Sequence, residues 1–419
     1  MTRLAPLVIA FGCLAIAANL PTIRMVETEG EGRRYWPRWR GPSGQGIVEG
    51  TGYVDRWSST ENILWKVRMP GRGHSSPIVW GDRIFLTTAY DDGPKRAMVA
   101  YRRSDGQKVW ETTMPEAPGE KLYRKNSHAS GTPSTDGERI YAYFGNGGLV
   151  AVDMNGKLAW HHDFGTVTLY HGSGGSPLLY KDRVIVYQDQ KVGSYIAAVH
   201  AKTGKLLWKS DREETIGWGT PVAVRVGDRD EIVVSSYKRV TGYDPDTGKL
   251  LWHASGNTVE VTPTPAVGEG LVFCPSGRAG PTLAIRPGGR GDVTESHIAW
   301  QTPRGSPFIP SPLVYGKYLY LVNDMTSIAT CFEAATGKLM WQGRLGEAQR
   351  ESFSASPVGV GGKVYFTNDD GETFVLAAGP EFKLLHVNQM GERMLATPAL
   401  VDAKWYFRTE NHLVAVGRK

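Results

Sequence analysis

A set of basic and aromatic side chains recurs at one kind of place in the sequence, a few residues before a Ser-Pro or Thr-Pro dipeptide. Arginine makes charge-assisted hydrogen bonds to anionic groups, and a tryptophan ring offers a flat face for stacking. Together such groups could hold an anionic or sugar-like ligand. Loop residues of this kind also often hydrogen-bond only to backbone, and that interpretation stays open for each of them. The candidates are Arg72, His74, His128, His171, Ser173, Trp218, Arg304, Phe308, Arg350, Ser354 and Arg393.

Three of these candidates are histidines, which raises the question of a metal site. Three imidazoles at about 2 Å from one zinc ion would make an open catalytic centre. However, His74, His128 and His171 lie three, five and six residues before the next proline, so their spacing does not imply that they meet at one point. We predict no metal site and no catalytic residues.

Other chemistries have little support in the sequence. It contains neither a nucleophile elbow nor a phosphate-binding glycine loop. The 48 Lys and Arg residues against 42 Asp and Glu residues give a formal charge of +6, but the two signs alternate along the chain and no basic run is present. Nucleic-acid binding is therefore disfavoured.

The elements that must position the candidates can be identified from the dipeptides themselves. Proline fits the first residue of a strand, where no ladder donor is required, so each dipeptide indicates the start of a strand in a sheet. An apolar run follows, then a turn and a second β-rich run, which is typical of a hairpin. The eight prolines are at positions 77, 133, 177, 221, 265, 312, 357 and 398.

A second marker closes each repeat. A short turn precedes a strand that contains Trp, and Gly lies four residues before the Trp in 105–110, 155–160, 203–208, 247–252 and 336–341. Trp300 lacks the Gly, and His386 replaces the Trp in the seventh copy. We predict that each Trp docks against the adjacent repeat and buries its aromatic surface there. The predicted docking residues are Trp65, Trp110, Trp160, Trp208, Trp252, Trp300 and Trp341.

These repeats predict an all-β, eight-bladed β-propeller over residues 60–419. Each repeat has about four short strands with apolar residues on both faces, which only neighbouring repeats can bury. The 51 glycines and 25 prolines are also typical of a turn-rich chain. The last repeat ends without a Trp strand, whereas the segment around Trp65 resembles one. This N-terminal strand should therefore close the last blade, which leaves few free sheet edges.

The N-terminus predicts export. Residues 1–20 contain a mostly apolar run from Leu4 to Leu20 and resemble a secretory signal with a cleavage site near Ala17, although an uncleaved membrane anchor is also possible from its length. A faint lipobox at Cys13 would instead tether the chain by a lipid. Residues 21–59 form a leader. Cys274 and Cys331 occur in apolar strand-like segments and are expected to be small buried hydrophobes.

The pattern Thr-Gly-Lys-Leu-Leu-Trp at 203–208 and 247–252 resembles the tryptophan-docking motif of the pyrroloquinoline-quinone-like (PQQ-like) repeat family. The resemblance covers about residues 60–419. The leader sequence from Trp36 to Pro42 resembles the segment that precedes such propellers in exported proteins of the BamB type. The resemblance implies a propeller fold, but the family includes both quinoprotein dehydrogenases and noncatalytic binding propellers.

Two functions follow from the resemblance. A quinoprotein dehydrogenase would bind PQQ and calcium and would need carboxylate ligands and an Asp base, which cannot be placed in this sequence. Many alcohol-oxidising members also have a disulfide between adjacent cysteines, and this chain has no Cys-Cys pair. We therefore expect a noncatalytic scaffold that has no cofactor and is monomeric. It should be exported and should bind a protein, peptide or glycan in the periplasm or outer cell envelope. PQQ-dependent dehydrogenation is the alternative.

Overall fold

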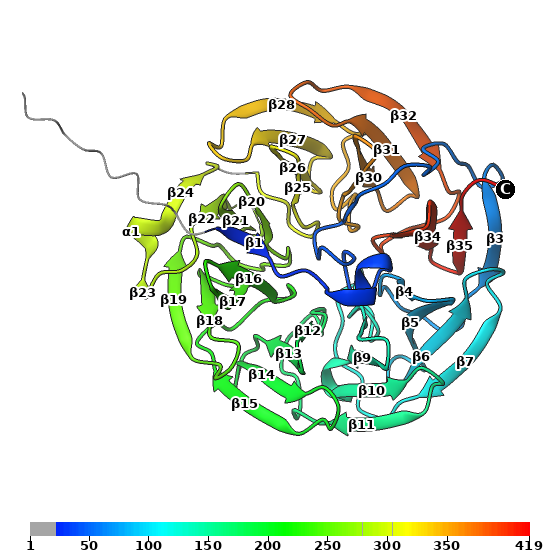
Figure 1. The fold of residues 1–419 in the computed structure, drawn as a ribbon, viewed down its shortest axis with the longest axis horizontal. Coiled ribbons are helices and arrows are strands. Elements are labelled where there is room, and N and C mark those ends of the chain that lie inside the picture. Colours follow the sequence, from blue (N-terminus) through cyan, green and yellow to red (C-terminus); the bar gives the residue numbers. More distant parts are fainter. Residues whose placement is uncertain (1–21, 279, 304) are drawn as a thin grey trace, which may run out of the picture.

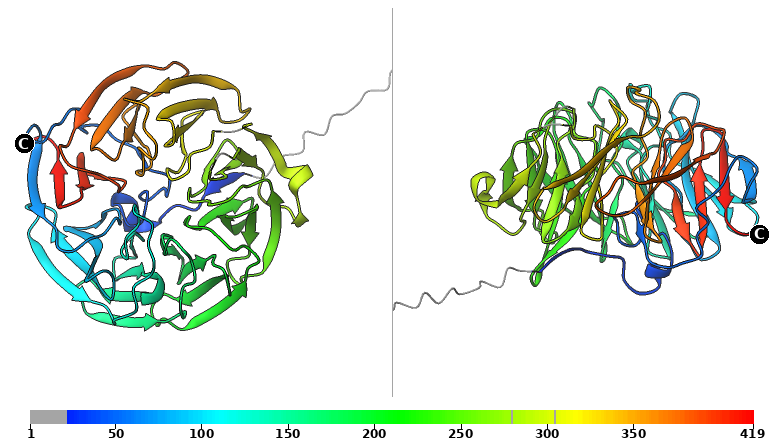
Figure 2. Two further views of the ribbon diagram at one scale, coloured as in Figure 1. Left: turned by 180° about the vertical axis from the view of Figure 1, so that it is seen from behind. Right: turned by 90° about the horizontal axis from the view of Figure 1, so that it is seen from above.

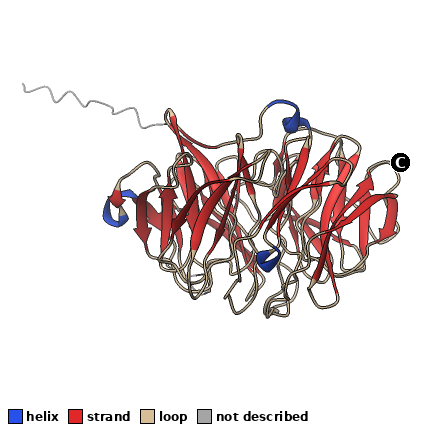
Figure 3. Cartoon of the chain, turned by 90° about the horizontal axis from the view of Figure 1, so that it is seen from below, coloured by secondary structure: helices blue, strands red, loops and turns tan. Residues whose placement is uncertain are grey.

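The structure is a computed structural model that describes residues 22–278, 280–303 and 305–419. Within these residues, eight sheets stand like blades around a central axis (Figure 1). Helix is limited to η1 (Gly30–Arg34), η2 (Gly145–Gly147) and α1 (Thr294–His297) in the described part of the chain, and the strands make up the body of the ring (Figure 3). The predicted eight-bladed, all-β propeller is confirmed.

The first four blades follow the chain, each from its inner to its outer strand. Blade 1 contains β4 (Ile78–Trp80), β5 (Arg83–Tyr90), β6 (Lys95–Arg102) and β7 (Lys108–Thr113). Blade 2 contains β8 (Ser134–Thr135), β9 (Arg139–Tyr143), β10 (Leu149–Asp153) and β11 (Leu158–His162). Blade 3 contains β12 (Leu178–Tyr180), β13 (Arg183–Gln188), β14 (Tyr195–His200) and β15 (Leu206–Asp211). Blade 4 contains β16 (Val222–Val226), β17 (Arg229–Ser235), β18 (Arg239–Tyr243) and β19 (Leu250–Ser255).

The other four blades complete the ring. Blade 5 contains β20 (Ala266–Gly268), β21 (Leu271–Pro275), β22 (Thr282–Ile285) and β24 (Ile298–Gln301). Blade 6 contains β25 (Leu313–Tyr315), β26 (Tyr318–Asn323), β27 (Ile328–Glu333) and β28 (Leu339–Arg344). Blade 7 contains β29 (Val358–Val360), β30 (Lys363–Thr367), β31 (Glu372–Ala377) and β32 (Leu384–Gln389). Blade 8 contains β33 (Ala399–Val401), β34 (Lys404–Arg408), β35 (His412–Val416) and β3 (Ile63–Arg68).

The ring is closed as the sequence predicts. Strand β3 precedes blade 1 in the chain but forms the outer strand of blade 8, antiparallel to β35, with Trp65 opposite Ala415 and Val67 opposite Leu413. Because the two ends of the propeller share one sheet, β3 covers the edge of β35 that would otherwise be unpaired at the closure. The apolar cores lie between blades: one cluster joins Phe85 and Met98 of blade 1 to Ile140 of blade 2.

Tryptophan side chains connect six of the eight blade pairs by one repeated contact. In each, the indole N–H of an outer strand donates to a backbone carbonyl in the last turn of the next blade, at 2.9–3.1 Å. In five of the six, all except Trp341, the indole ring lies against the turn glycine. At Gly204, which has a φ of +68°, a Cβ atom would come within 2.7 Å of the Trp160 ring, so both the backbone conformation and the space require glycine. The six are Trp65, Trp110, Trp160, Trp208, Trp300 and Trp341.

Trp252, at the junction of blades 4 and 5, departs from this expectation. Its indole N–H donates to Glu231 Oε2 of its own blade at 2.7 Å, although its ring still packs with Val272 of blade 5. Blade 5 does not present the usual turn, because the chain between β22 and β24 instead forms β23 (Gly291–Asp292) and α1. Strand β23 pairs in parallel with β19 and extends the outer edge of blade 4.

The junction of blades 7 and 8 lacks a docking Trp, because His386 occupies that position. Its imidazole Nε2 is instead 2.6 Å from the backbone oxygen of Asp55 in the leader. Nearby, Trp57 of the leader is buried, with its ring centroid 5.2 Å from that of Trp405 and 5.4 Å from that of Phe407. Trp57 of the leader thus supplies an aromatic side chain near the junction at which blade 7 has no docking Trp.

The leader crosses one face of the ring before it enters β3 (Figures 1 and 2). Its β1 (Ile23–Met25) pairs with β16 of blade 4, Trp36 forms a bridge with Val79 of blade 1, and β2 (Ile47–Val48) pairs in parallel with β29 of blade 7. Buried Arg40 donates to the carbonyl oxygen of Pro312 in blade 6. The leader therefore ties distant blades together on this face.

The expected signal segment, residues 1–20, and the lipobox at Cys13 lie outside the described residues. No helix in the described part of the chain is long and apolar enough to cross a membrane. Cys274 and Cys331 are free and buried, as expected for small core residues.

Deletion of residues 60–68 should destabilise the entire ring, because it removes β3 and exposes the edge of β35. We expect one cooperative unfolding transition at a clearly lower temperature, measured by calorimetry. The control is Arg68→Ser, which changes an exposed side chain but keeps the strand. An unchanged melting temperature for the deletion would contradict closure by β3.

Candidate functional site

The inner ends of the blades are joined by a ring of eight hydrogen bonds. Each Ser or Thr that precedes a strand-opening proline donates its backbone N–H to the side-chain hydroxyl of the equivalent residue in the next blade, at 2.8–3.1 Å. The last bond, from Thr397 N–H to Ser76 Oγ, returns to blade 1. We call this set the hydroxyl ring: Ser76, Thr132, Ser176, Thr220, Thr264, Ser311, Ser356 and Thr397.

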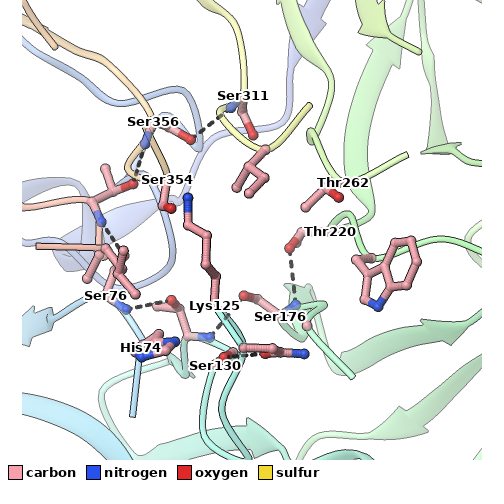
Figure 4. A pocket seen from close by; sticks show the side chains of 18 of the residues that line it. His74, Ser76, Lys125, Ser130, Ser176, Thr220, Thr262, Ser311, Ser354 and Ser356 are labelled. Carbon is pink, nitrogen blue, oxygen red and sulfur yellow. Dashed lines mark hydrogen bonds between the residues drawn. The ribbon is translucent and has the colours of Figure 1, made fainter. Parts of the chain in front are cut away.

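The hydroxyl ring surrounds an axial pocket of about 200 Å³, to which all eight of its residues contribute (Figure 4). On the leader's side, the pocket wall includes Trp39. On the opposite side, it includes His74, His171, Trp218 and Phe308. The pocket therefore lies on the propeller axis, with hydroxyl groups around its middle and larger side chains toward each end.

The loop between β7 and β8 crosses the mouth of this pocket, and we call residues 114–128 the strap. Tyr123 of the strap donates its hydroxyl to Glu351 at 2.6 Å, on the far side of the ring before blade 7, and Arg124 forms an ion pair with the same carboxylate. Asn126 donates to the backbone oxygen of His171, before blade 3, at 2.8 Å. The strap is thus held at both sides of the mouth.

Lys125 of the strap extends into the pocket, and its ammonium group approaches the side of Ser354 (Figure 4). The side chain is only 3% exposed. Its Nζ lies 2.8 Å from Asp369 Oδ2, whose side chain is 9% exposed, and 2.9 Å from the backbone oxygen of Glu351. Burial raises the pKa of Asp369, although the Lys125 ammonium opposes this shift. A pair this buried is costly to break, because either partner alone would be an unpaired charge.

His74 lies where blade 1 meets the pocket. Its Nδ1 is buried and has no hydrogen-bond partner among the described residues. Burial lowers the pKa of His74 to about 3, and the nearby positive charges of Arg408, Arg72 and Arg393 act in the same direction. The imidazole is therefore neutral at physiological pH.

His171 and Trp218 form an aromatic wall at the mouth. Their ring centroids are 5.9 Å apart with an interplanar angle of 30°, and the Trp218 indole N–H donates to the backbone oxygen of Gly172 at 2.8 Å. Tyr170 packs edge-on to Trp218 at 6.0 Å. Burial lowers the pKa of His171. The wall thus presents a fixed, uncharged flat surface.

The other predicted candidates divide into several groups. Ser354 lines the axial pocket, whereas Ser173 donates to Gln188 at 2.9 Å. His128 is turned away, because its Nε2 accepts from the backbone N–H of Glu120. Arg72 donates to the backbone of the strap at Arg124, 3.2 Å away.

The remaining arginines contribute less. Arg393 lies 3.8 Å from Asp369 and lines a smaller neighbouring cavity rather than the axial pocket. Arg350 is exposed and is not among the residues that line the axial pocket. Arg304 lies outside the described residues. Only some of the candidate residues expected from the spacing therefore line the axial pocket.

Sequence reasoning missed Lys125, Tyr123, Asn126 and Trp39. A signal for the strap was present, because the interval from Trp110 to Pro133 is the longest between an outer-strand Trp and the next Ser/Thr-Pro. Long loops in compact folds are often functional. Nothing in the sequence pairs Lys125 with Asp369, which lies several repeats further along the chain.

The side chains that line the pocket differ from those that would hold a calcium ion and a quinone. Among the described residues, no three His, Cys, Asp or Glu side chains are grouped as metal ligands. No carboxylate lines the described wall of the axial pocket, and its one formally charged side chain is the cation Lys125. Calcium is held mainly by carboxylate and carbonyl oxygens. These residues do not fit a calcium-bound quinone.

The fold and the axial pocket define a propeller of PQQ-like repeats. A family model described as "Outer membrane protein assembly factor BamB" matches residues 47–166, 99–342 and 273–380. The chain therefore belongs to this family.

Solved structures with similar folds come from both functional groups. The crystal structure of BamB from Moraxella catarrhalis has a TM-score of 0.60 and 14% identity, covering 85% of this chain and 97% of that chain. The quinohemoprotein alcohol dehydrogenase from Comamonas testosteroni has a TM-score of 0.68 and 12% identity, covering 93% and 82%. No curated protein sequence matches this chain. At these identities the structural matches show the fold alone.

Thr220→Val should remove one acceptor from the hydroxyl ring and leave the buried N–H of Ser176 unpaired. We expect a loss of about 1–3 kcal/mol in the free energy of unfolding, measured by urea titration. Thr262→Val is the matched control, because Thr262 lines the same pocket but is not part of the hydroxyl ring. Equal stabilities for the two variants would show that the ring is not a stabilising element.

His74 should make stability depend on pH. Its pKa is about 3 in the folded chain, against 6.5 for an unperturbed imidazole. As pH falls below 6.5, the unfolded state takes up a proton first, so stability is lost toward pH 3. We expect His74→Gln to reduce this slope by up to about 1.4 kcal/mol per pH unit in urea unfolding at pH 7, 6 and 5. The exposed His161→Gln is the control, and equal slopes for both variants would refute the assignment.

Proposed function

We propose that this chain is a noncatalytic binding propeller of the cell envelope that serves as a scaffold for protein–protein interaction. The observation that carries the proposal is the composition of the axial pocket, which offers hydroxyl, imidazole and ammonium groups but no carboxylate in its described wall. An oxidation at this position would need a general base and ligands for a cation. Binding requires neither.

The closed construction of the ring also supports a scaffold. The leader crosses one face and the strap crosses the mouth on the other, so both ends of the axial pocket are bounded by the chain itself. Such ties hold the loops at the mouth in fixed positions, which lowers the entropy lost when a partner binds. A rigid ring with ordered loops is suited to docking.

The mouth offers an anchoring surface for a partner. Tyr170, His171 and Trp218 lie together there, and aromatic residues often contribute most of the binding energy at protein interfaces. We infer that a protein, peptide or glycan contacts this aromatic wall. Membership in a family named for an outer-membrane assembly factor supports a location in the periplasm or outer envelope, with membrane contact only through the N-terminus. We propose that the chain acts as a monomer.

The first test is enzymatic. After incubation with PQQ and calcium, we expect no dye-linked oxidation of alcohols or sugars above the background of the heat-denatured protein. Trp218→Ala is assayed in parallel. Robust turnover that is abolished by Trp218→Ala would overturn the scaffold proposal and support a PQQ-dependent dehydrogenase.

A second experiment tests for binding of a partner directly, by site-specific photocrosslinking in the producing cell. A crosslinker at Lys121, on the strap, should form a discrete adduct with an envelope partner, and Trp218→Ala should diminish that adduct. A crosslinker at Lys317, in the turn between β25 and β26, is the control position. Adducts of equal yield at both positions would argue against docking at the mouth.

A further inference from the structure

The hydroxyl ring has unused hydrogen-bonding capacity. A hydroxyl has one donor and two acceptor positions. Each hydroxyl in the ring accepts a backbone N–H, but no hydrogen bond among the described residues takes up its proton. Eight O–H donors are therefore left at the wall of one polar pocket.

The ammonium group of Lys125 adds a charged donor to the same space. It has three N–H donors, of which the structure uses one for Asp369 and one for the backbone oxygen of Glu351. The third has no partner among the described residues. Figure 4 shows the Lys125 side chain extending along the pocket, with its ammonium group near Ser354.

The charges around the mouth favour an anion. Lys125 is balanced by Asp369, which also lies 3.8 Å from Arg393, and Arg124 is paired with Glu351. A smaller cavity that shares His74 with the pocket is lined by Arg72, Arg393 and Arg408 and by one carboxylate, that of Glu410. Arg408 is buried, and its Nε has no partner among the described residues. The excess of positive side chains in this smaller cavity would attract a negative group at the neighbouring end of the axial pocket more strongly than a neutral one.

The shape and lining of the pocket indicate the rest of the ligand. A volume of about 200 Å³ suits a small molecule rather than the surface of a protein. The fixed ring of Trp218 provides a flat wall on which the C–H face of a sugar ring can stack, while hydroxyl donors surround it. The unpartnered Nδ1 of His74 offers one further hydrogen bond.

We propose that the axial pocket binds a small hydroxylated monocarboxylate of the sugar-acid class, with the carboxylate on Lys125 and the hydroxyl groups on the hydroxyl ring and on the Thr262 hydroxyl of the same wall. The proposal rests on the noncatalytic function inferred above and deepens it, because it adds a small-molecule site to the docking surface at the mouth. Occupation of the pocket would also brace the strap, since Lys125 belongs to it.

The test is calorimetric titration of the full chain with glucuronate and with glucose, which lacks the carboxylate. We expect saturable binding of glucuronate at least about tenfold tighter than binding of glucose, the effect of about one charge-assisted hydrogen bond. The double variant Lys125→Met/Asp369→Asn removes the charged pair without leaving either partner alone, and it should abolish this preference. Retained preference in the double variant, or no saturable binding of glucuronate to the wild type, would overturn the proposal.

A second variant covers the case in which the double variant does not fold. Thr262→Val removes a hydroxyl from the pocket wall outside the hydroxyl ring, so the propeller should stay intact. It should weaken glucuronate binding by several-fold, and unchanged affinity would count against the proposal. Failure of these titrations is distinguishable from failure of the scaffold function, because the dehydrogenase assay and the crosslinking at Lys121 do not depend on glucuronate.

Discussion

The ring of backbone-to-hydroxyl hydrogen bonds around the axis is the constraint on which the rest of the structure depends. Each bond joins the start of one blade to the start of the next, and the eighth returns to the first. Proline after each Ser or Thr favours an extended conformation at that residue, so its N–H and side chain can face different neighbours. If each bond contributes about 1 kcal/mol, the ring supplies about 8 kcal/mol, which is comparable to the whole stability of a typical domain.

The outer side of the propeller tolerates more variation than this inner ring. Trp docking is kept at six junctions, replaced by an intrablade bond at Trp252, and replaced by the leader at His386. Packing of large apolar surfaces is non-directional, so another aromatic residue such as Trp57 can fill the gap between blades 7 and 8. A hydrogen-bonded ring cannot substitute partners in this way, because each member serves two neighbours at once. Every one of the eight repeats therefore keeps its hydroxyl.

The sequence predicted the elements that repeat, and missed those that occur once. Eight Ser/Thr-Pro dipeptides and the Trp strands were enough for blade number and for closure by β3, because local patterns recur there. The strap and the Lys125–Asp369 pair depend on a contact between distant repeats, for which one sequence holds no periodic signal. Of the candidate site, His74, His171, Trp218 and Phe308 reached the pocket, whereas His128 and Arg350 did not, because position before a proline sets the blade but not the direction of a side chain.

The same ring that holds the blades also determines what the pocket can accept. Its hydroxyl oxygens already receive N–H groups from the neighbouring blade, and Lys125 brings only further donors. A site that converges donors suits the oxygens of an anion or a sugar and repels a cation such as calcium, which needs converging lone pairs and negative charge. Similarity in fold to an alcohol dehydrogenase at 12% identity shows the fold alone, so the chemistry at the axis has to be argued from the donor set of this chain. In this chain, closing the ring uses one acceptor position of each axial hydroxyl and leaves its proton available for the oxygen atoms of a ligand.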